Sequence, residues 1–136
     1  IQLLQAYITT DYDAKIYIDT PFSVTIVFFN FIDEYLSINL ICRLLTNEVI
    51  FEYPLPYKKI NKGKNEITFF IPANFLNSNL YTFQVNFGVY GPKILFYQEK
   101  ILTFEIHNKT VIEGFYQKLS GYICPKFKYQ IRNNDY

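Results

Sequence analysis

Apolar residues occupy every second position along most of this chain, and the pattern is sharpest between Ile67 and Val89. The alternating apolar residues of that stretch are Ile67, Phe69 and Ile71, followed by Tyr81, Phe83, Val85, Phe87 and Val89. A period of two places each set on one face of a β-sheet. The stretch therefore predicts two strands joined by a short connection.

The segment between these two strands has the composition of a compact corner. Pro72 has no amide N–H to donate, so it should end the first strand. Asn77 and Asn79 flank a serine and favour a turn, since asparagine tolerates a left-handed backbone better than most residues. Phe75 and Leu76 are apolar residues within this polar segment. We expect them to close one end of the core.

Shorter alternating runs predict the remaining strands. They cover residues 1–9, 14–20, 22–29, 36–45, 49–51, 94–96 and 101–106. Turns are expected at residues 11–13, 33–34, 46–48, 62–65 and 91–93, and two prolines predict an extended loop over 53–57. No segment keeps a period of 3.6 residues over three turns, so the chain is predicted to be all-β. Short strands with regular turns are typical of a sandwich or barrel, and we expect an immunoglobulin-like β-sandwich.

The predicted domain organisation is a sandwich over residues 1–107, followed by a C-terminal tail over 108–136. We expect residues 22–29 and 67–71 in one sheet, and residues 36–44, 81–89 and 101–106 in the other. The tail ends in a run that resembles a strand, at residues 126–131. A strand added this late must pair with an exposed sheet edge, in the same molecule or in a second copy. The fold is therefore expected to carry an extra C-terminal strand that a dimer can exchange.

The overall composition narrows the class of protein. A length of 136 residues suits one domain, and a hydrophobic fraction of 50% with 18% charged residues is typical of a folded core. The formal net charge of +1 gives no reason to expect a nucleic-acid partner. No apolar run approaches the length of a bilayer span, so direct membrane insertion is not expected. Ile1 is not an initiator residue and no signal peptide opens the chain, so we expect a fragment of a longer protein.

Cysteine, histidine and carboxylate residues show no catalytic or metal-binding pattern. Cys42 sits in an alternating apolar run and is expected to be a small buried residue, while a disulfide with Cys124 stays open as an alternative. These cysteines and the sole histidine, His107, match no usual ligand spacing, so neither a metal nor another cofactor is expected. The acidic residues lie mostly at predicted turns, and no pair is forced together as glycoside hydrolysis requires. We expect a non-catalytic domain, and the catalytic alternative is a fragment of a glycoside hydrolase.

The outward positions of the second predicted sheet are polar. They are Asn39, Arg43, Thr82, Gln84, Asn86, Thr103 and Glu105. Each sugar hydroxyl donates once and accepts twice, so a face with amide donors and amide acceptors suits carbohydrate. Arg43 could bind a charged or phosphorylated sugar, and Tyr90 and Tyr97 offer rings for the C–H face of a pyranose. The alternative is an ordinary solvated sheet face.

The outward positions of the first predicted sheet are apolar instead. Val27, Phe29 and Phe70 would face solvent there, and each such side chain is worth about 1.5–3 kcal/mol when buried. We expect all three to be covered by the tail or by a partner subunit. The alternative is that inward and outward positions are reversed on one strand.

Three segments of the chain form a recognisable combination. They are the corner Ile71-Pro72-Ala73-Asn74-Phe75-Leu76 with the strand that starts at Tyr81, the strand at residues 101–106, and the tail segment at residues 121–129. The combination resembles the C-terminal domains of Wzt-type proteins, the ATP-hydrolysing subunits of bacterial ABC transporters for O-antigen polysaccharide. The resemblance extends over about residues 16–129, and the corner is its most specific part. Asn79, Cys124 and Tyr129 depart from the family, which usually has glycine, a basic residue and tryptophan there.

The resemblance implies an immunoglobulin-like domain that binds the finished polysaccharide, often at its modified non-reducing end. It also implies a homodimer with exchangeable C-terminal strands, held in the cytoplasm by a tethered ATPase domain and a membrane permease. The ATPase domain itself lies outside this chain, because the sequence contains no G-x-x-x-x-G-K-[ST] motif.

We therefore expect a non-catalytic carbohydrate-binding module that selects O-antigen polysaccharide for export. Its expected sugar contacts are Asn39, Arg43, Thr82, Gln84, Asn86 and Tyr90. The alternative is an immunoglobulin-like dimerisation or protein-docking module that binds no glycan. The apolar outward positions of the first sheet and the additional tail favour that alternative.

Overall fold

The computed structural model has an all-β fold and describes residues 1–10, 15–90, 93–108, 121–123, 128 and 130–132. Its strands are β1 (Gln2–Thr10), β2 (Ile16–Tyr17), β3 (Phe22–Asn30), β4 (Tyr35–Leu44), β5 (Val49–Pro54), β6 (Lys58–Lys59), β7 (Gly63–Ile71), β8 (Asn79–Val89) and β9 (Lys93–His107). The described residues contain no helix, so the all-β prediction is confirmed. Among these same residues there is accordingly no apolar helix of membrane-spanning length.

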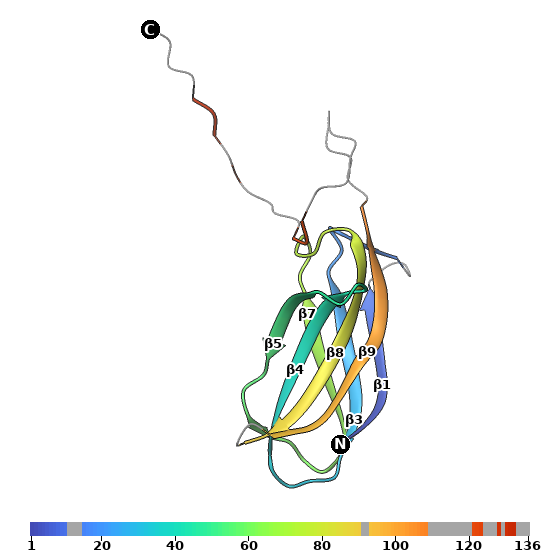
Figure 1. The fold of residues 1–136 in the computed structure, drawn as a ribbon, viewed down its shortest axis with the longest axis vertical. Coiled ribbons are helices and arrows are strands. Elements are labelled where there is room, and N and C mark those ends of the chain that lie inside the picture. The colour runs from blue at the N-terminus through green and yellow to red at the C-terminus, as the bar shows by residue number, and fades with distance from the viewer. Residues whose placement is uncertain (11–14, 91–92, 109–120, 124–127, 129, 133–136) are drawn as a thin grey trace.

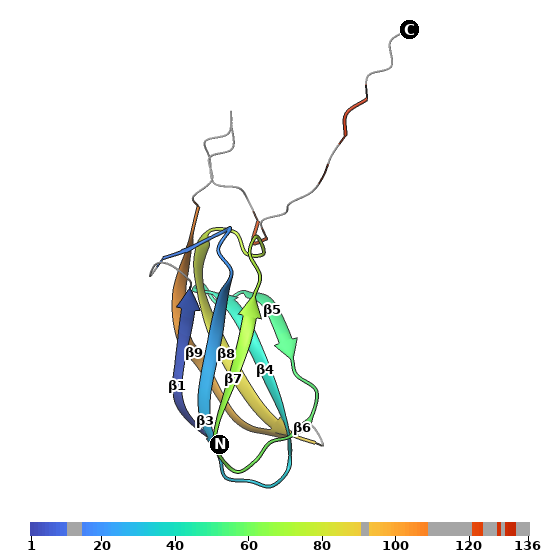
Figure 2. The same ribbon diagram turned by 180° about the vertical axis from the view of Figure 1, so that it is seen from behind.

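The strands form two sheets that face one another as two layers (Figure 1, Figure 2). The smaller sheet has the order β1-β3-β7, and the larger has the order β2-β9-β8-β4-β5 with β6 paired to β4. The larger sheet is strongly curled into a half-barrel. The predicted assignment of these strands to two sheets is confirmed, because β3 and β7 share one sheet while β4, β8 and β9 share the other.

Several strand boundaries differ from the prediction: β5 runs through Pro54 into the predicted loop, and β2 has only the two residues Ile16–Tyr17. Residues 94–96 and 101–106 belong to one continuous strand, β9, whose register shifts where it passes from Phe83 to Val85 of β8. Lys100 has a φ of 52° within this irregular stretch. Between the partners of Phe83 and Val85, β9 has the three residues 99–101 whereas β8 has only Gln84, so this stretch bulges out of the regular register. Gly63, expected in a turn, instead begins β7 with a φ of 110°.

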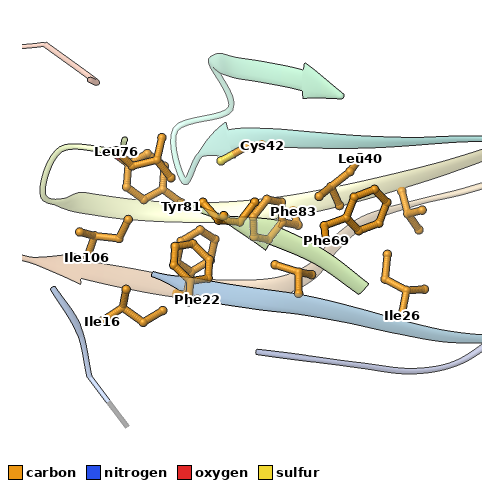
Figure 3. Packing of buried hydrophobic residues seen from close by; sticks show 14 of the residues in the cluster. Ile16, Phe22, Ile26, Leu40, Cys42, Phe69, Leu76, Tyr81, Phe83 and Ile106 are labelled. Carbon is orange, nitrogen blue, oxygen red and sulfur yellow. The ribbon is translucent and has the colours of Figure 1, made fainter. Parts of the chain in front are cut away.

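Apolar residues from both sheets meet in one core (Figure 3). The two sheets are joined by ring contacts such as that between Phe28 of β3 and Phe87 of β8, whose centroids lie 4.8 Å apart. Phe83 is 0% exposed and stacks on Phe104 at 4.9 Å, while Phe51 of β5 meets it edge-on at 6.3 Å. Pairs of this kind contribute about 0.5–1.5 kcal/mol each beyond area burial. The alternating residues of the central strands therefore point inward as predicted.

The outer face of the smaller sheet corrects one expectation. Val27 is only 5% exposed, and it lies in register between Gln5 of β1 and Glu66 of β7. The two flanking strands therefore cover this valine within the chain, and neither the tail nor a partner is needed. Phe29 is half-buried and contacts Phe31, with 4.6 Å between the ring centroids. Phe70 is 83% exposed, so its expected cover is not present among the described residues.

The corner between β7 and β8 closes one end of the core as predicted. Pro72 directly follows the end of β7, and Leu76 is 2% exposed within the core cluster. Phe75 packs against that cluster and contacts Phe51 edge-on, with ring centroids 5.6 Å apart. The left-handed backbone conformation falls at Asn74, with a φ of 58°, rather than at residues 77–79.

Asn77 is a buried polar residue that the sequence pattern presented only as a turn former. It is 1% exposed, and its side-chain Nδ2 donates to the Gly121 carbonyl at 2.9 Å. Its backbone N–H donates to the Tyr122 carbonyl at 2.8 Å, and Leu76 forms a bridge with Ile123. The hydroxyl of Tyr81 donates to the Asn77 carbonyl at 2.6 Å. This corner therefore anchors residues 121–123 to the domain.

Replacing Asn77 by alanine is expected to destabilise the domain by about 1 kcal/mol, because the part-buried hydrogen bond from its side chain to the Gly121 carbonyl is lost. Residues 121–123 should also open more readily, since their side-chain hydrogen bond is lost. Urea denaturation measures the first effect, and amide hydrogen exchange at residue 77, whose backbone N–H donates to the Tyr122 carbonyl, measures the second. Asn79→Ala is the matched control, because the Asn79 side chain accepts only an exposed bond from Leu80. Equal exchange at residue 77 in both variants would contradict the anchoring role.

The late part of the chain is described only in pieces. Cys124 lies outside the described residues, so the alternative of a disulfide is not addressed there. Cys42 is a free thiol and 0% exposed, as expected for a small buried residue. Of the strand predicted at residues 126–131, Lys128, Gln130 and Ile131 are described, and none of these three is in a strand.

Candidate functional site

The polar residues predicted to bind sugar come mainly from β4 and β8, the two central strands of the larger sheet. Antiparallel pairing places Asn39 opposite Asn86 and Arg43 opposite Thr82, with Gln84 between these pairs on β8. Directly paired residues lie on the same face of a sheet. The structure thus brings five of the six predicted residues together on the outer face.

Hydrogen bonds connect Arg43, Gln84 and Asn86 in a chain in which each side chain donates to the next. The Nε of Arg43 donates to Oε1 of Gln84 at 3.1 Å, and its Nη1 donates to the carbonyl of Asn47 at 3.1 Å. The Nε2 of Gln84 then donates to Oδ1 of Asn86 at 2.9 Å. Arg43 is therefore engaged with its own sheet, rather than extended toward solvent as its predicted role with a charged sugar would require.

A second hydrogen bond holds the other amide of the face. Nδ2 of Asn39 donates to Oε1 of Glu52, on the neighbouring strand β5, at 2.9 Å. Because a carboxylate only accepts, the Oδ1 of Asn39 remains directed away from this bond.

Thr82 differs from the other predicted contacts. It is 2% exposed, and its hydroxyl donates to the Leu102 carbonyl of β9 at 2.8 Å. This hydrogen bond ties β8 to β9 beneath the exposed surface. Thr82 thus supports the sheet that carries the site.

A hollow of about 340 Å³ opens on this face beside the two asparagines. Its lining includes Ser37, Asn39, Glu52, Tyr57, Asn86 and Lys93. Gly88 and Ile94 complete it from β8 and β9. Two strands thus form the floor, while β5, the loop after it and β9 form the walls. The hollow therefore lies where the side-chain amides of Asn39 and Asn86 are neighbours on adjacent strands.

Tyr57 lines this hollow, and two further tyrosines lie near it: Tyr90 contacts the Tyr57 ring and Tyr97 pairs with Asn86. The rings of Tyr57 and Tyr90 meet nearly edge-on, with centroids 5.5 Å apart, and the Tyr57 hydroxyl donates to the Val89 carbonyl at 3.3 Å. Tyr90 is 83% exposed, and Tyr97, paired with Asn86, is 61% exposed. Tyr90 therefore lies near the other predicted contacts but contributes from the rim.

Several lining residues escaped the sequence interpretation. Ser37 and Gly88 occupy the same alternating positions as the predicted residues on β4 and β8, so the two-residue period could have identified them. Glu52 and Tyr57 come from β5 and the loop after it, and their placement depends on long-range pairing. The described residues hold no cluster of three or more histidine, cysteine or carboxylate side chains suited to a metal ion.

Gly88 forms part of the floor because a side chain would not fit there. A Cβ atom at this position would lie 2.9 Å from Oγ of Ser37 and 3.1 Å from the Lys93 carbonyl oxygen. The serine hydroxyl can rotate away, but the carbonyl belongs to the backbone of β9. The close approach of β8 and β9 at this point therefore requires glycine.

Replacing Gly88 by alanine is expected to lower the free energy of unfolding by about 1–3 kcal/mol through overpacking. Urea denaturation measures the change. Adding Ser37→Gly should recover only the part caused by the serine hydroxyl, because the contact with the Lys93 carbonyl persists. Full recovery in the double variant would show that the backbone contact is relaxed in solution.

No protein-family model matches the sequence, and no curated protein matches it either.

Proposed function

We propose that this domain is a non-catalytic carbohydrate-binding module that recognises O-antigen-type polysaccharide through the outer face of the larger sheet. The observation that carries the proposal is the 340 Å³ hollow, in which two side-chain amides lie beside the ring of Tyr57. Amides supply the donors and acceptors that sugar hydroxyls need. Tyr57 and Tyr97 provide apolar rings for the C–H face of a pyranose. Polar and aromatic groups are thus combined at the scale of one or two sugar rings.

The wider setting of the proposal comes from the resemblance to Wzt-type domains. In that setting the module is an immunoglobulin-like domain in the cytoplasm, tethered to an ATPase domain and, through it, to a membrane permease. Its task is recognition: the transporter engages chains whose terminal structure fits the hollow. Neither a cofactor nor catalysis is part of this function.

The first test is isothermal titration of the domain with a panel of bacterial O-polysaccharides. Asn86→Ala is expected to weaken binding at least tenfold, because it removes one amide of the floor and the partner of Gln84. Gln84→Ala should weaken binding less, since Gln84 is 7% exposed and acts through Asn86. Asn61→Ala, in a distant exposed loop, is the control. Equal affinities in all four proteins would refute this site.

A second candidate function is dimerisation, favoured by a different surface. Two hollows of about 460 and 580 Å³ lie along the side between β5 and β7. Their apolar lining includes Phe28, Phe51, Ile67, Phe69, Phe70 and Phe75. The proposed occupant is the C-terminal segment of a second copy, because Ile123 pairs with Leu76 beside this groove. Such an exchange would also fit the resemblance.

Sedimentation of the full chain and of a chain ending at Asn108 separates the two candidates. A dimer that becomes a folded, sugar-binding monomer on truncation would support both roles as independent features. A full chain that is monomeric at all concentrations would refute the exchange.

A further inference from the structure

We infer that Arg43 and Glu52 are positioning residues, which orient two amides so that the hollow recognises adjacent hydroxyls on an uncharged sugar. The inference rests on the proposed carbohydrate-binding function and adds the chemical class of the ligand. It also reassigns Arg43, which the sequence alone presented as a direct contact to a charged sugar.

The orientation of Asn86 follows from an obligate donor. A guanidinium has only N–H groups, so the atom of Gln84 that faces Nε of Arg43 must be its oxygen. The other end of the Gln84 amide is then its NH₂ group, which donates to Asn86. The bonded atom of Asn86 must therefore be Oδ1, and its Nδ2 is the end left for a ligand. Arg43 thus fixes Asn86 as a donor through one intervening amide.

The orientation of Asn39 follows from an obligate acceptor. The carboxylate of Glu52 has only acceptor oxygens, so the atom of Asn39 at 2.9 Å must be Nδ2. The remaining end of this amide is Oδ1, an acceptor. Asn39 and Asn86 are directly paired across β4 and β8. The floor therefore presents an acceptor beside a donor, and the charged residues on either side prevent both amides from turning over.

An acceptor beside a donor matches two neighbouring hydroxyls of one sugar ring. One hydroxyl donates to Oδ1 of Asn39, and the next accepts from Nδ2 of Asn86. A trans N-acyl group fits less well, because its N–H and C=O point in opposite directions. The charges of the lining also favour an uncharged ring, since Glu52 disfavours an anionic sugar and Lys93 a cationic one.

The test is ¹⁵N–¹H NMR of the full chain, with the side-chain NH₂ groups assigned. The neutral probes are the methyl glycosides of D-mannose, D-glucose, D-galactose and L-rhamnose, with their monodeoxy analogues. At least one is expected to shift the Asn86 NH₂ signals strongly and the Asn39 NH₂ signals less, because the Asn39 NH₂ group keeps its hydrogen bond to Glu52. The analogue that lacks one of the paired hydroxyls should bind at least tenfold more weakly. Methyl glucuronide and methyl N-acetylglucosaminide are the charged and acylamino comparisons.

Variants separate positioning from folding. Arg43→Gln replaces a group that can only donate, and Glu52→Gln replaces a group that can only accept. The new amide can do both, so the neighbouring amide is no longer held in one orientation. Affinity for the best neutral glycoside should therefore fall about tenfold. Discrimination against its deoxy analogue should also fall. Arg43→Lys keeps a partner that only donates and should restore most of the discrimination, and Glu66→Gln on the smaller sheet is the matched control. A purely structural role would not change discrimination between two glycosides in a folded variant.

The outcomes are distinct. Binding of the charged or acylamino glycoside in preference to every neutral one overturns the inference and leaves carbohydrate binding standing. If none of the glycosides binds while O-polysaccharides do bind, the inference is also overturned. If the O-polysaccharides do not bind either, the proposed function itself is refuted. Unchanged discrimination in Arg43→Gln and Glu52→Gln overturns the positioning role even when neutral glycosides bind.

Discussion

Replacing Phe83 by alanine is expected to lower the free energy of unfolding by about 3–5 kcal/mol, through lost burial and the cavity left behind. Phe83 is 0% exposed and contacts Phe104 and Phe51, so no neighbour can collapse into the space without giving up its own contacts. Domains of this size are stable by about 5–15 kcal/mol, so the variant should lose a large share of its stability. Urea denaturation followed by circular dichroism measures the change.

Phe70→Ala is the control for this prediction. It removes the same side chain from the same fold, but Phe70 is 83% exposed on the smaller sheet. Its free energy of unfolding should stay within about 0.5 kcal/mol of the unmodified domain. A large loss in Phe70→Ala that grows with protein concentration would mean that a second copy covers this ring. A small loss in Phe83→Ala would contradict the core described above.

Alkaline solution is expected to destabilise the domain through Cys42. Burial of this thiol raises its pKa from 9.0 to about 12. A raised pKa means that the native state holds its proton more tightly than the unfolded state. The resulting stability is fully present below pH 9 and is lost as the pH rises through about 12, by up to about 4 kcal/mol in total. Burial, followed by the neighbouring Cys42 thiol, also raises the pKa of Tyr81.

The comparison of Cys42→Ala with the unmodified domain measures the thiol together with its effect on Tyr81, because every other ionisable group is common to both. At pH 7 the alanine variant should be less stable by about 1 kcal/mol, since a small buried group is removed. Above pH 9 its stability should fall less steeply, so the two curves should converge and then cross. Denaturant titrations between pH 7 and 11 under reducing conditions measure this. Parallel curves would mean that the thiol ionises equally well in both states.

The strand pattern of this fold was predictable because burial on one side of a sheet imposes a period of two. Phe22, Val24, Ile26 and Phe28 alternate inward on β3, and the two sheets contain the predicted strands. The same reasoning failed at Val27, because the period assigns a side chain to a face but not the neighbours that cover it. It also failed at β9, where a bulge at residues 99–101 interrupts the register without ending the strand.

The candidate site was predictable only in its central strands. Asn39 and Asn86 follow from alternation, whereas Glu52 and Tyr57 reach the hollow through the pairing of β5 and the path of the loop after it. The orientation of each amide depends on which charged group lies beside it, and no local pattern contains that information. The same limit applies to Asn77, whose burial depends on residues 121–123. Local periodicity therefore predicts on which face of a sheet a side chain lies. Long-range contacts determine its hydrogen-bond partners and thus the chemistry of the site.

The two residues of β2 pair in parallel with Ile106 and His107, at the far end of β9. During synthesis on the ribosome, Ile16 emerges early, but its partner strand is among the last parts of the domain to appear. Such non-local pairing forms late, because the intervening chain must be ordered before the two ends meet. Ile16, only 4% exposed in the finished fold, must therefore stay uncovered on the nascent chain until β9 is complete. Completion of the larger sheet therefore waits until β9 has been synthesised.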